Sequence, residues 1–177
     1  MQNKVQKYGV IKVKAKYYWE DFEVGDRTKL GSKKFQKNSI IEFAKKYDPQ
    51  LFHISEGEAS KSIFGGIISS GWQTCSEMMK IICDSYLLET ASYGSPGIEK
   101  LAWSKPVKPD DEITLFREIK SKRLSKSNRN IGIIIMLFEA KNQSGELVLS
   151  MEVCQMRGPK RSEQKQPCSN YSSQRAR

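Results

Sequence analysis

The sequence predicts an α+β fold in which a curved antiparallel sheet wraps one long central helix. The segment from about Ser70 to Leu88 has apolar residues at helical spacing on a wide face, and such a face has to be covered by other elements. β-forming runs joined by short polar hairpin loops follow this segment. The 177 residues suffice for one domain of about 100–150 residues with its own core, plus two terminal segments.

The residues before the long helix predict a leading segment, a first strand and a shorter helix. Residues 17–26 mix aromatic and acidic side chains and end in a turn signal. Residues 28–35 can form a strand, and Asn38 or Ser39 can cap the helix that follows. We therefore expect this helix to begin next to one of these two caps.

The end of the shorter helix places an acid and an imidazole near each other in the sequence. Pro49 ends the helix because a proline disfavours helical geometry at the residue before it. Asp48 therefore lies at the helix terminus, and His53, the only histidine, follows five residues later in the predicted loop. A carboxylate and a side chain of a type that titrates near neutrality are two of the parts needed for acid–base chemistry.

A glycine-rich stretch then leads into the long helix. It reads Phe64-Gly65-Gly66-Ile67-Ile68-Ser69-Ser70-Gly71-Trp72. Its glycines permit a tight turn or a close approach of the backbone to a ligand, and Ser70 can cap the helix. The first amides of a helix can bind developing negative charge. Trp72 falls on the apolar face, so we expect it, like Trp103, to lie in the core.

Four further strands complete the predicted sheet. They cover residues 98–104, 112–124, 131–141 and 147–156, and polar hairpin loops join the last three. Long strands that follow one another in the chain can curl round a helix as an antiparallel sheet. That layout is a hot-dog fold.

The charge distribution argues against a nucleic-acid-binding domain. Residues 1–16 carry five lysines and no acid, and residues 157–177 carry six Lys or Arg and one Glu. The other 19 basic and 19 acidic residues cancel, so the net charge of +10 lies in the two ends. A nucleic-acid-binding fold would carry its charge on structured elements. We therefore expect a domain over residues 17–158, a basic N-terminal tail over 1–16 and a disordered basic C-terminal tail over 159–177.

The four cysteines indicate free thiols. Cys75 and Cys83 fall on the long helix about 12 Å apart along its axis, which is too far for a disulfide. One histidine without clustered cysteines argues against a metal site. Free thiols fit a reducing cytosol, and the chain shows no signal-peptide core and no apolar run long enough to cross a membrane. We therefore expect a cytoplasmic protein with no metal and no membrane partner.

Taken together, these segments resemble the MaoC-like dehydratase family, hot-dog proteins that include (R)-specific enoyl-CoA hydratases. The resemblance covers about residues 17–157 and rests on five pieces in the family's order. They are Phe22-Glu23-Val24-Gly25-Asp26, Asp48 with His53, the stretch from Phe64 to Trp72, Gly94-Ser95-Pro96-Gly97 and Lys105-Pro106-Val107-Lys108-Pro109-Asp110-Asp111. Each piece alone is a weak signal, whereas five in order are specific.

The resemblance implies an acyl-CoA hydratase or dehydratase of fatty acid metabolism. In this family Asp48 and His53 would activate a water for addition to an enoyl thioester. The backbone N–H of Gly71 would bind the thioester carbonyl, with Ser70 and Gly66 beside it. Coenzyme A would be part of the substrate, no other cofactor would be needed, and the protein would form a homodimer or a larger homo-oligomer.

Two positions depart from the family pattern and leave alternatives open. Gln50 stands near the histidine where the family usually has asparagine, and Ser69-Ser70-Gly71 replaces Ala-His-Gly at the helix start. These changes alter how the water is held and which group lines the carbonyl site. A hot-dog thioesterase would release free coenzyme A, and a non-catalytic acyl-CoA-binding subunit would bind without turnover and tolerate changes at Asp48 and His53.

Overall fold

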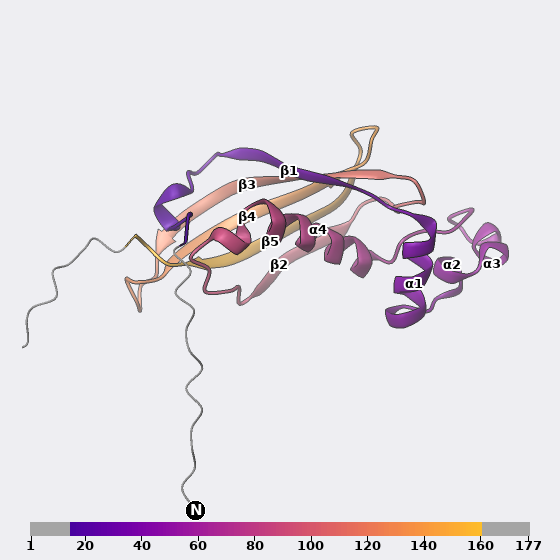
Figure 1. Ribbon diagram of the computed structural model, residues 1–177, viewed down its shortest axis with the longest axis horizontal. Coiled ribbons are helices and arrows are strands. Elements are labelled where there is room, and N and C mark those ends of the chain that lie inside the picture. The colour runs from indigo at the N-terminus through magenta and orange to yellow at the C-terminus, as the bar shows by residue number, and fades with distance from the viewer. Residues whose placement is uncertain (1–14, 161–177) are drawn as a thin grey trace, which may run out of the picture.

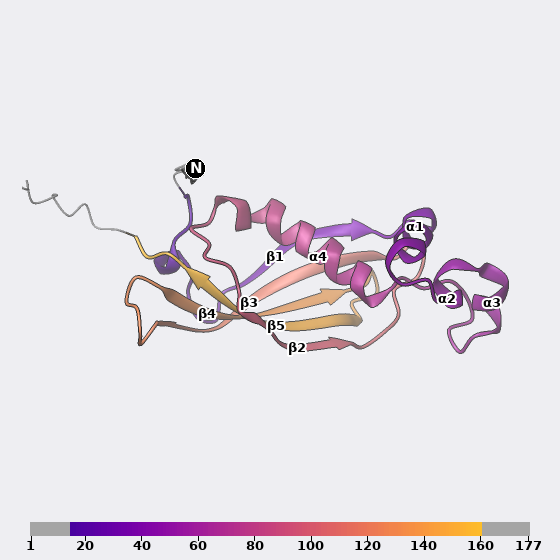
Figure 2. The same cartoon turned by 90° about the horizontal axis from the view of Figure 1, so that it is seen from below.

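The computed structural model describes residues 15–160 and confirms the α+β hot-dog fold. Its five-stranded antiparallel sheet has the order β1-β3-β4-β5-β2, and the long helix α4 (Gly71–Ser85) lies along one face of it (Figures 1 and 2). The strands are β1 (Arg27–Lys34), β2 (Gly97–Trp103), β3 (Glu112–Leu124), β4 (Gly132–Lys141) and β5 (Leu147–Arg157).

Three short helices gather beyond the N-terminal end of α4 (Figure 1). They are α1 (Lys37–Tyr47), α2 (Leu51–Ile54) and α3 (Glu56–Lys61), and two 3-10 turns, η1 (Trp19–Asp21) and η2 (Leu87–Glu89), lie elsewhere in the chain. Within residues 15–160, no helix has the length and apolar character needed to span a membrane.

Two local predictions in this region are wrong. Helix α1 begins at Lys37 after Gln36, whose side chain makes no capping bond, so neither Asn38 nor Ser39 is the cap. His53 lies in α2, because the turn after Pro49 continues into one helical turn instead of an open loop.

The core follows the alternation that a strand buried on one face requires. Every second residue of β4 is buried, including Ile134, Met136 and Phe138. These side chains pack in one cluster with Met78 and Ile82 of α4. Burying each large apolar side chain stabilises the fold by roughly 1.5–3 kcal/mol. The packing of α4 on the sheet therefore stabilises both elements.

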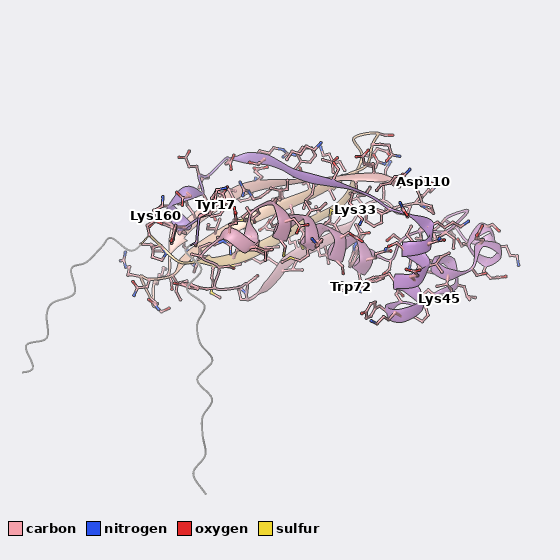
Figure 3. The ribbon with its side chains drawn as sticks, in the orientation of Figure 1. Tyr17, Lys33, Lys45, Trp72, Asp110 and Lys160 are labelled. Atoms are coloured by element: carbon pink, nitrogen blue, oxygen red, sulfur yellow. The ribbon has the colours of Figure 1, made fainter. Side chains whose placement is uncertain are left out.

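The two tryptophans that we expected in the core are partly exposed. Trp72 is 58% exposed and Trp103 is 45% exposed. Figure 3 shows Trp72 at the end of α4 that faces α1, with Tyr17 and Lys160 at the opposite end of the molecule. Trp72 belongs to the first turn of α4, and Trp103 is the last residue of the edge strand β2. Helical and strand periodicity gave the right elements but not these environments.

The described ends of the chain pack on the domain. The N–H of Lys16 donates to the carbonyl of Glu89 at 2.7 Å, and Lys160 forms an ion pair with Asp21. Arg157, which we counted with the C-terminal charge, is the last residue of β5 and only 1% exposed. The contacts of Lys16 and Lys160 lie just outside the predicted bounds of 17–158, and the rest of both predicted tails lies outside the described residues.

Removing residues 1–12 and 162–177 together should leave the melting temperature nearly unchanged. These segments lack apolar periodicity, and the trimmed chain keeps the contacts of Lys16 and Lys160. Calorimetry of the full-length and trimmed proteins checks this. A fall of more than about 5 °C, roughly 1 kcal/mol or more for a domain of this size, would show that one of the removed segments packs on the domain.

Candidate active site

A folded-back loop brings Asp48 and His53 together. The N–H of Gln50 donates to the carbonyl of Asp48 at 2.8 Å, and the N–H of His53 donates to the carbonyl of Gln50 at 2.9 Å. These two turns reverse the chain after α1 ends at Tyr47. As a result, Nε2 of His53 lies 3.3 Å from Oδ2 of Asp48.

The second ring nitrogen fixes the tautomer of His53. Nδ1 lies 2.7 Å from the carbonyl oxygen of Ile68, and a carbonyl can only accept, so Nδ1 carries a hydrogen. The imidazole is 4% exposed, and Phe52 packs against it edge to face. Nε2 is therefore the atom that can exchange a proton, and it faces Asp48.

Two neutral side chains hold the Asp48 carboxylate. The hydroxyl of Ser70 donates to Oδ2 at 2.7 Å, and the amide of Gln50 donates to Oδ1 at 2.8 Å. Burial alone would raise the pKa of Asp48, but the hydrogen bonds from Ser70 and Gln50 and the nearby imidazole of His53 outweigh it, so the pKa lies below its ordinary value. The site thus favours an ionised carboxylate.

Ser70 has two roles in the structure. Its oxygen accepts a hydrogen bond from the N–H of Trp72 at 3.3 Å, so it caps α4 as expected. The bond to Asp48, 22 residues away in the chain, was not predicted. Because the side chain is completely buried, Ser70 lies behind the carboxylate, where it supports Asp48.

Gly71 is the first residue of α4. The first amides of a helix have no partner within the helix and can bind a ligand. A β-carbon built on Gly71 would lie 2.6 Å from Cε2 of Trp103. A side chain larger than glycine therefore fits at this position only if the indole or the first helical turn moves.

The site lies in a cavity of about 470 Å³. Asp48, His53 and Gly71 line it together, with Gln50 beside Asp48 and His53. Its other walls are mainly apolar or aromatic, and they include Phe64, Ile68, Trp72, Trp103, Val107 and Val148. Gly66, which we expected near the substrate, lies in the preceding loop, outside this cavity.

Trp72 and Trp103 line this cavity, although sequence reasoning assigned both to the core. Trp72 and Trp103 pack edge to face with their ring centroids 5.5 Å apart. Their apolar spacing assigned both to the core. The signal that could have placed them was positional, because one begins a helix and the other ends an edge strand.

For any reaction that needs the ionised Asp48 carboxylate, Ser70→Ala should move the acidic limb of the pH–rate profile to higher pH. A lowered pKa means that the fold stabilises the ionised form, so the contribution of Asp48 to stability is present above its ordinary pKa and is lost as the pH falls through the folded value. Without the hydroxyl donor, the pKa of Asp48 rises and the carboxylate protonates earlier on acidification. Rates measured from pH 3 to 8 check this, with Ser76→Ala, an exposed serine of α4, as the control. Identical acidic limbs in wild type and Ser70→Ala would contradict it.

Comparisons with known proteins agree with this fold. The sequence profile of the MaoC like domain matches residues 21–133. The chain is 31% identical over 134 residues to the uncharacterized protein YdeM of Bacillus subtilis (strain 168), covering 76% of this chain and 94% of that protein.

Solved structures have the same fold. The crystal structure of the MaoC-like dehydratase from Rhodospirillum rubrum has a TM-score of 0.74 and 29% identity, over 82% of this chain and 99% of that chain. An (R)-hydratase from A. caviae involved in PHA biosynthesis has a TM-score of 0.63 and 23% identity, over 79% of this chain and 99% of that chain; at this identity the likeness concerns the fold alone. With the profile matching most of the hot-dog domain, the chain belongs to the MaoC-like domain family.

Proposed function

We propose that the protein is an acyl-CoA hydratase or dehydratase, which adds water to a 2-enoyl thioester or removes it from a 3-hydroxyacyl thioester. One observation carries the proposal. Nε2 of His53 and a carboxylate oxygen of Asp48 lie 3.3 Å apart, in the same cavity as Gly71 at the N-terminus of α4. Family membership supports this class of reaction.

The arrangement suits acid–base catalysis on one water. Asp48 and Nε2 of His53 would hold the water, whose oxygen forms a bond to C3 of the enoyl group while its proton passes to the pair. The pair returns a proton to C2, and both transfers occur on one face of the substrate. In the reverse direction, the same groups remove a proton from C2 and protonate the leaving hydroxyl.

The N-terminus of α4 would stabilise the charge that develops during the reaction. Negative charge accumulates on the thioester oxygen as C3 is attacked, and the free N–H of Gly71, aided by the helix dipole, can bind it. The reaction moves only one water and protons, so the proposal needs no metal or redox cofactor. Coenzyme A enters as part of the substrate.

A panel of short, long and branched 2-enoyl-CoA thioesters tests the proposal. Hydration removes the conjugated double bond, so the expected result is a loss of its absorbance and the appearance of 3-hydroxyacyl-CoA. Release of free coenzyme A would identify a thioesterase instead. Binding of enoyl-CoA without any absorbance loss would identify a non-catalytic binding subunit.

The protein should sediment as a homodimer or a larger homo-oligomer at micromolar concentration. Both edge strands contain a bulge, between Lys29 and Gly31 in β1 and between Ile98 and Lys100 in β2. Strand β1 in addition carries several lysines, which discourage pairing. The other edge, β2, has exposed apolar side chains, with Ile98 48% exposed. Ile98→Lys should weaken the assembly, whereas Lys33→Glu on β1 should not. A wild-type protein that sediments as a monomer would contradict this prediction.

We also place the protein in the cytoplasm. Cys75, Cys83 and Cys154 are free thiols in the structure, and free thiols persist in a reducing compartment. Coenzyme A thioesters, the proposed substrates, would have to be available in the same compartment. Fractionation of cells that express the full chain checks the assignment.

A further inference from the structure

The indole of Trp103 is the group that holds the first turn of α4 from the side of the sheet. Its Nε1 donates to the carbonyl oxygen of Gly71 at 3.0 Å, which ties the edge strand β2 to the start of the helix. Its ring also covers Gly71 so closely that a β-carbon there would lie 2.6 Å from Cε2 and 2.7 Å from Nε1. The contact is therefore both a hydrogen bond and a steric fit.

Hydrophobic burial alone gives a weak reason for an indole at this place. Trp103 remains 45% exposed, and its aromatic neighbour Trp72 is 58% exposed. The stabilisation from burial scales with the apolar area removed from water, so both rings gain less than a core residue would. Both line the cavity that contains Asp48 and His53, which points to a role in that site.

The peptide group between Gly71 and Trp72 is held at both ends. Its carbonyl oxygen accepts from Nε1 of Trp103, and its N–H donates to the hydroxyl of Ser70 at 3.3 Å. The same hydroxyl donates to Asp48, whose carboxylate faces His53. A continuous series of hydrogen bonds thus runs from the edge strand through the first turn of α4 to the acid–base pair.

We infer that Trp103 is a positioning residue, which orients the first turn of α4 so that the N–H of Gly71 points at the thioester carbonyl. The inference rests on the proposed function. A fixed donor stabilises developing charge without having to reorganise during the reaction. The two hydrogen bonds to the peptide group between Gly71 and Trp72 limit rotation of the Gly71 backbone. Without them, glycine would permit many conformations.

The test is Trp103→Phe, which keeps an aromatic ring and removes the N–H donor. The matched control is Trp19→Phe, because Trp19 also packs against a glycine, Gly132, while its Nε1 has no hydrogen-bond partner within residues 15–160. We expect Trp103→Phe to lower kcat roughly 5- to 20-fold with KM changed less than about twofold, as for an interaction stronger in the transition state. Sedimentation of both variants establishes that they assemble as the wild type does.

The absorption of a bound chromophore directly reports how strongly its thioester carbonyl is polarised. The ultraviolet absorption of 3-phenylpropenoyl-CoA shifts to longer wavelength when a hydrogen-bond donor polarises its thioester carbonyl. We expect this shift in the wild type and in Trp19→Phe, and a smaller shift in Trp103→Phe. The amide hydrogen of Thr74, bonded to the carbonyl of Ser70 at 3.1 Å, should also exchange faster in Trp103→Phe.

The outcomes separate this inference from the proposed function. A wild type that shifts the chromophore but hydrates no enoyl-CoA refutes the proposed function, and a reduced shift in Trp103→Phe still supports the positioning role. Wild-type kcat and an unchanged shift in Trp103→Phe overturn that role, as does a wild type that gives no shift. If Trp103→Phe fails to fold, benzothienylalanine at position 103 keeps the ring shape without the N–H. Its kcat and the absorption shift of the bound chromophore then test the positioning role.

Discussion

Asp48→Asn and His53→Gln should each lower the turnover of an enoyl-CoA by roughly 10²-fold or more, the scale expected for the loss of a general acid–base group. Each change removes one partner of the pair that faces the cavity, with Nε2 of His53 3.3 Å from Oδ2 of Asp48. Asparagine in place of Asp48 would keep the shape of the side chain but not its charge, and glutamine in place of His53 cannot titrate. Steady-state kinetics on the best substrate of the panel measures the effect.

The double variant should be little worse than either single variant, because groups that act as a unit are not additive. Binding of the thioester should survive in all three, since Gly71 is untouched. The matched control is Asp84→Asn, an exposed carboxylate on α4 that pairs with Lys80, which should leave turnover unchanged. If His53→Gln and wild type bind enoyl-CoA equally and neither hydrates it, the hydratase proposal is wrong.

Gly71→Ala should lower kcat by roughly 10- to 10²-fold, approaching the loss of one oxyanion donor. The added methyl group would lie 2.6 Å from Cε2 of Trp103, so the ring or the first helical turn has to move. Because Trp103 is 45% exposed on an edge strand, its ring can swing outward, and the overpacking should cost only about 1–3 kcal/mol of stability. Kinetics and thermal melting on the same samples separate the two effects.

Gly57→Ala is the control for this substitution. Gly57 lies in α3, is exposed, and has no atom within 4 Å of the position its β-carbon would occupy. Alanine is the better helix former, so this variant should be at least as stable as the wild type and fully active. Equal kcat values for Gly71→Ala and wild type would show that the first turn of α4 does not bind the carbonyl.

Local sequence patterns predicted the elements of this fold well. The 112–124 segment is β3 with both predicted ends, and the long helix α4 lies within its predicted span. These predictions succeed because strand alternation and helical spacing record which face of each element is buried. The spacing of Asp48 and His53 also identified the pair that the structure brings together. Their catalytic roles remain predictions.

Other features depended on contacts between distant parts of the chain. Periodicity shows which face of an element is apolar, but not where the covering sheet ends, so it misplaced Trp72 and Trp103 in the core. The bond from Ser70 to Asp48 spans 22 residues, and that from Trp103 to Gly71 spans 32. The sequence by itself determined the hot-dog layout and indicated that Asp48 and His53 lie together. Only the tertiary structure decided how that pair is oriented, because hydrogen bonds between separate elements depend on how those elements pack together.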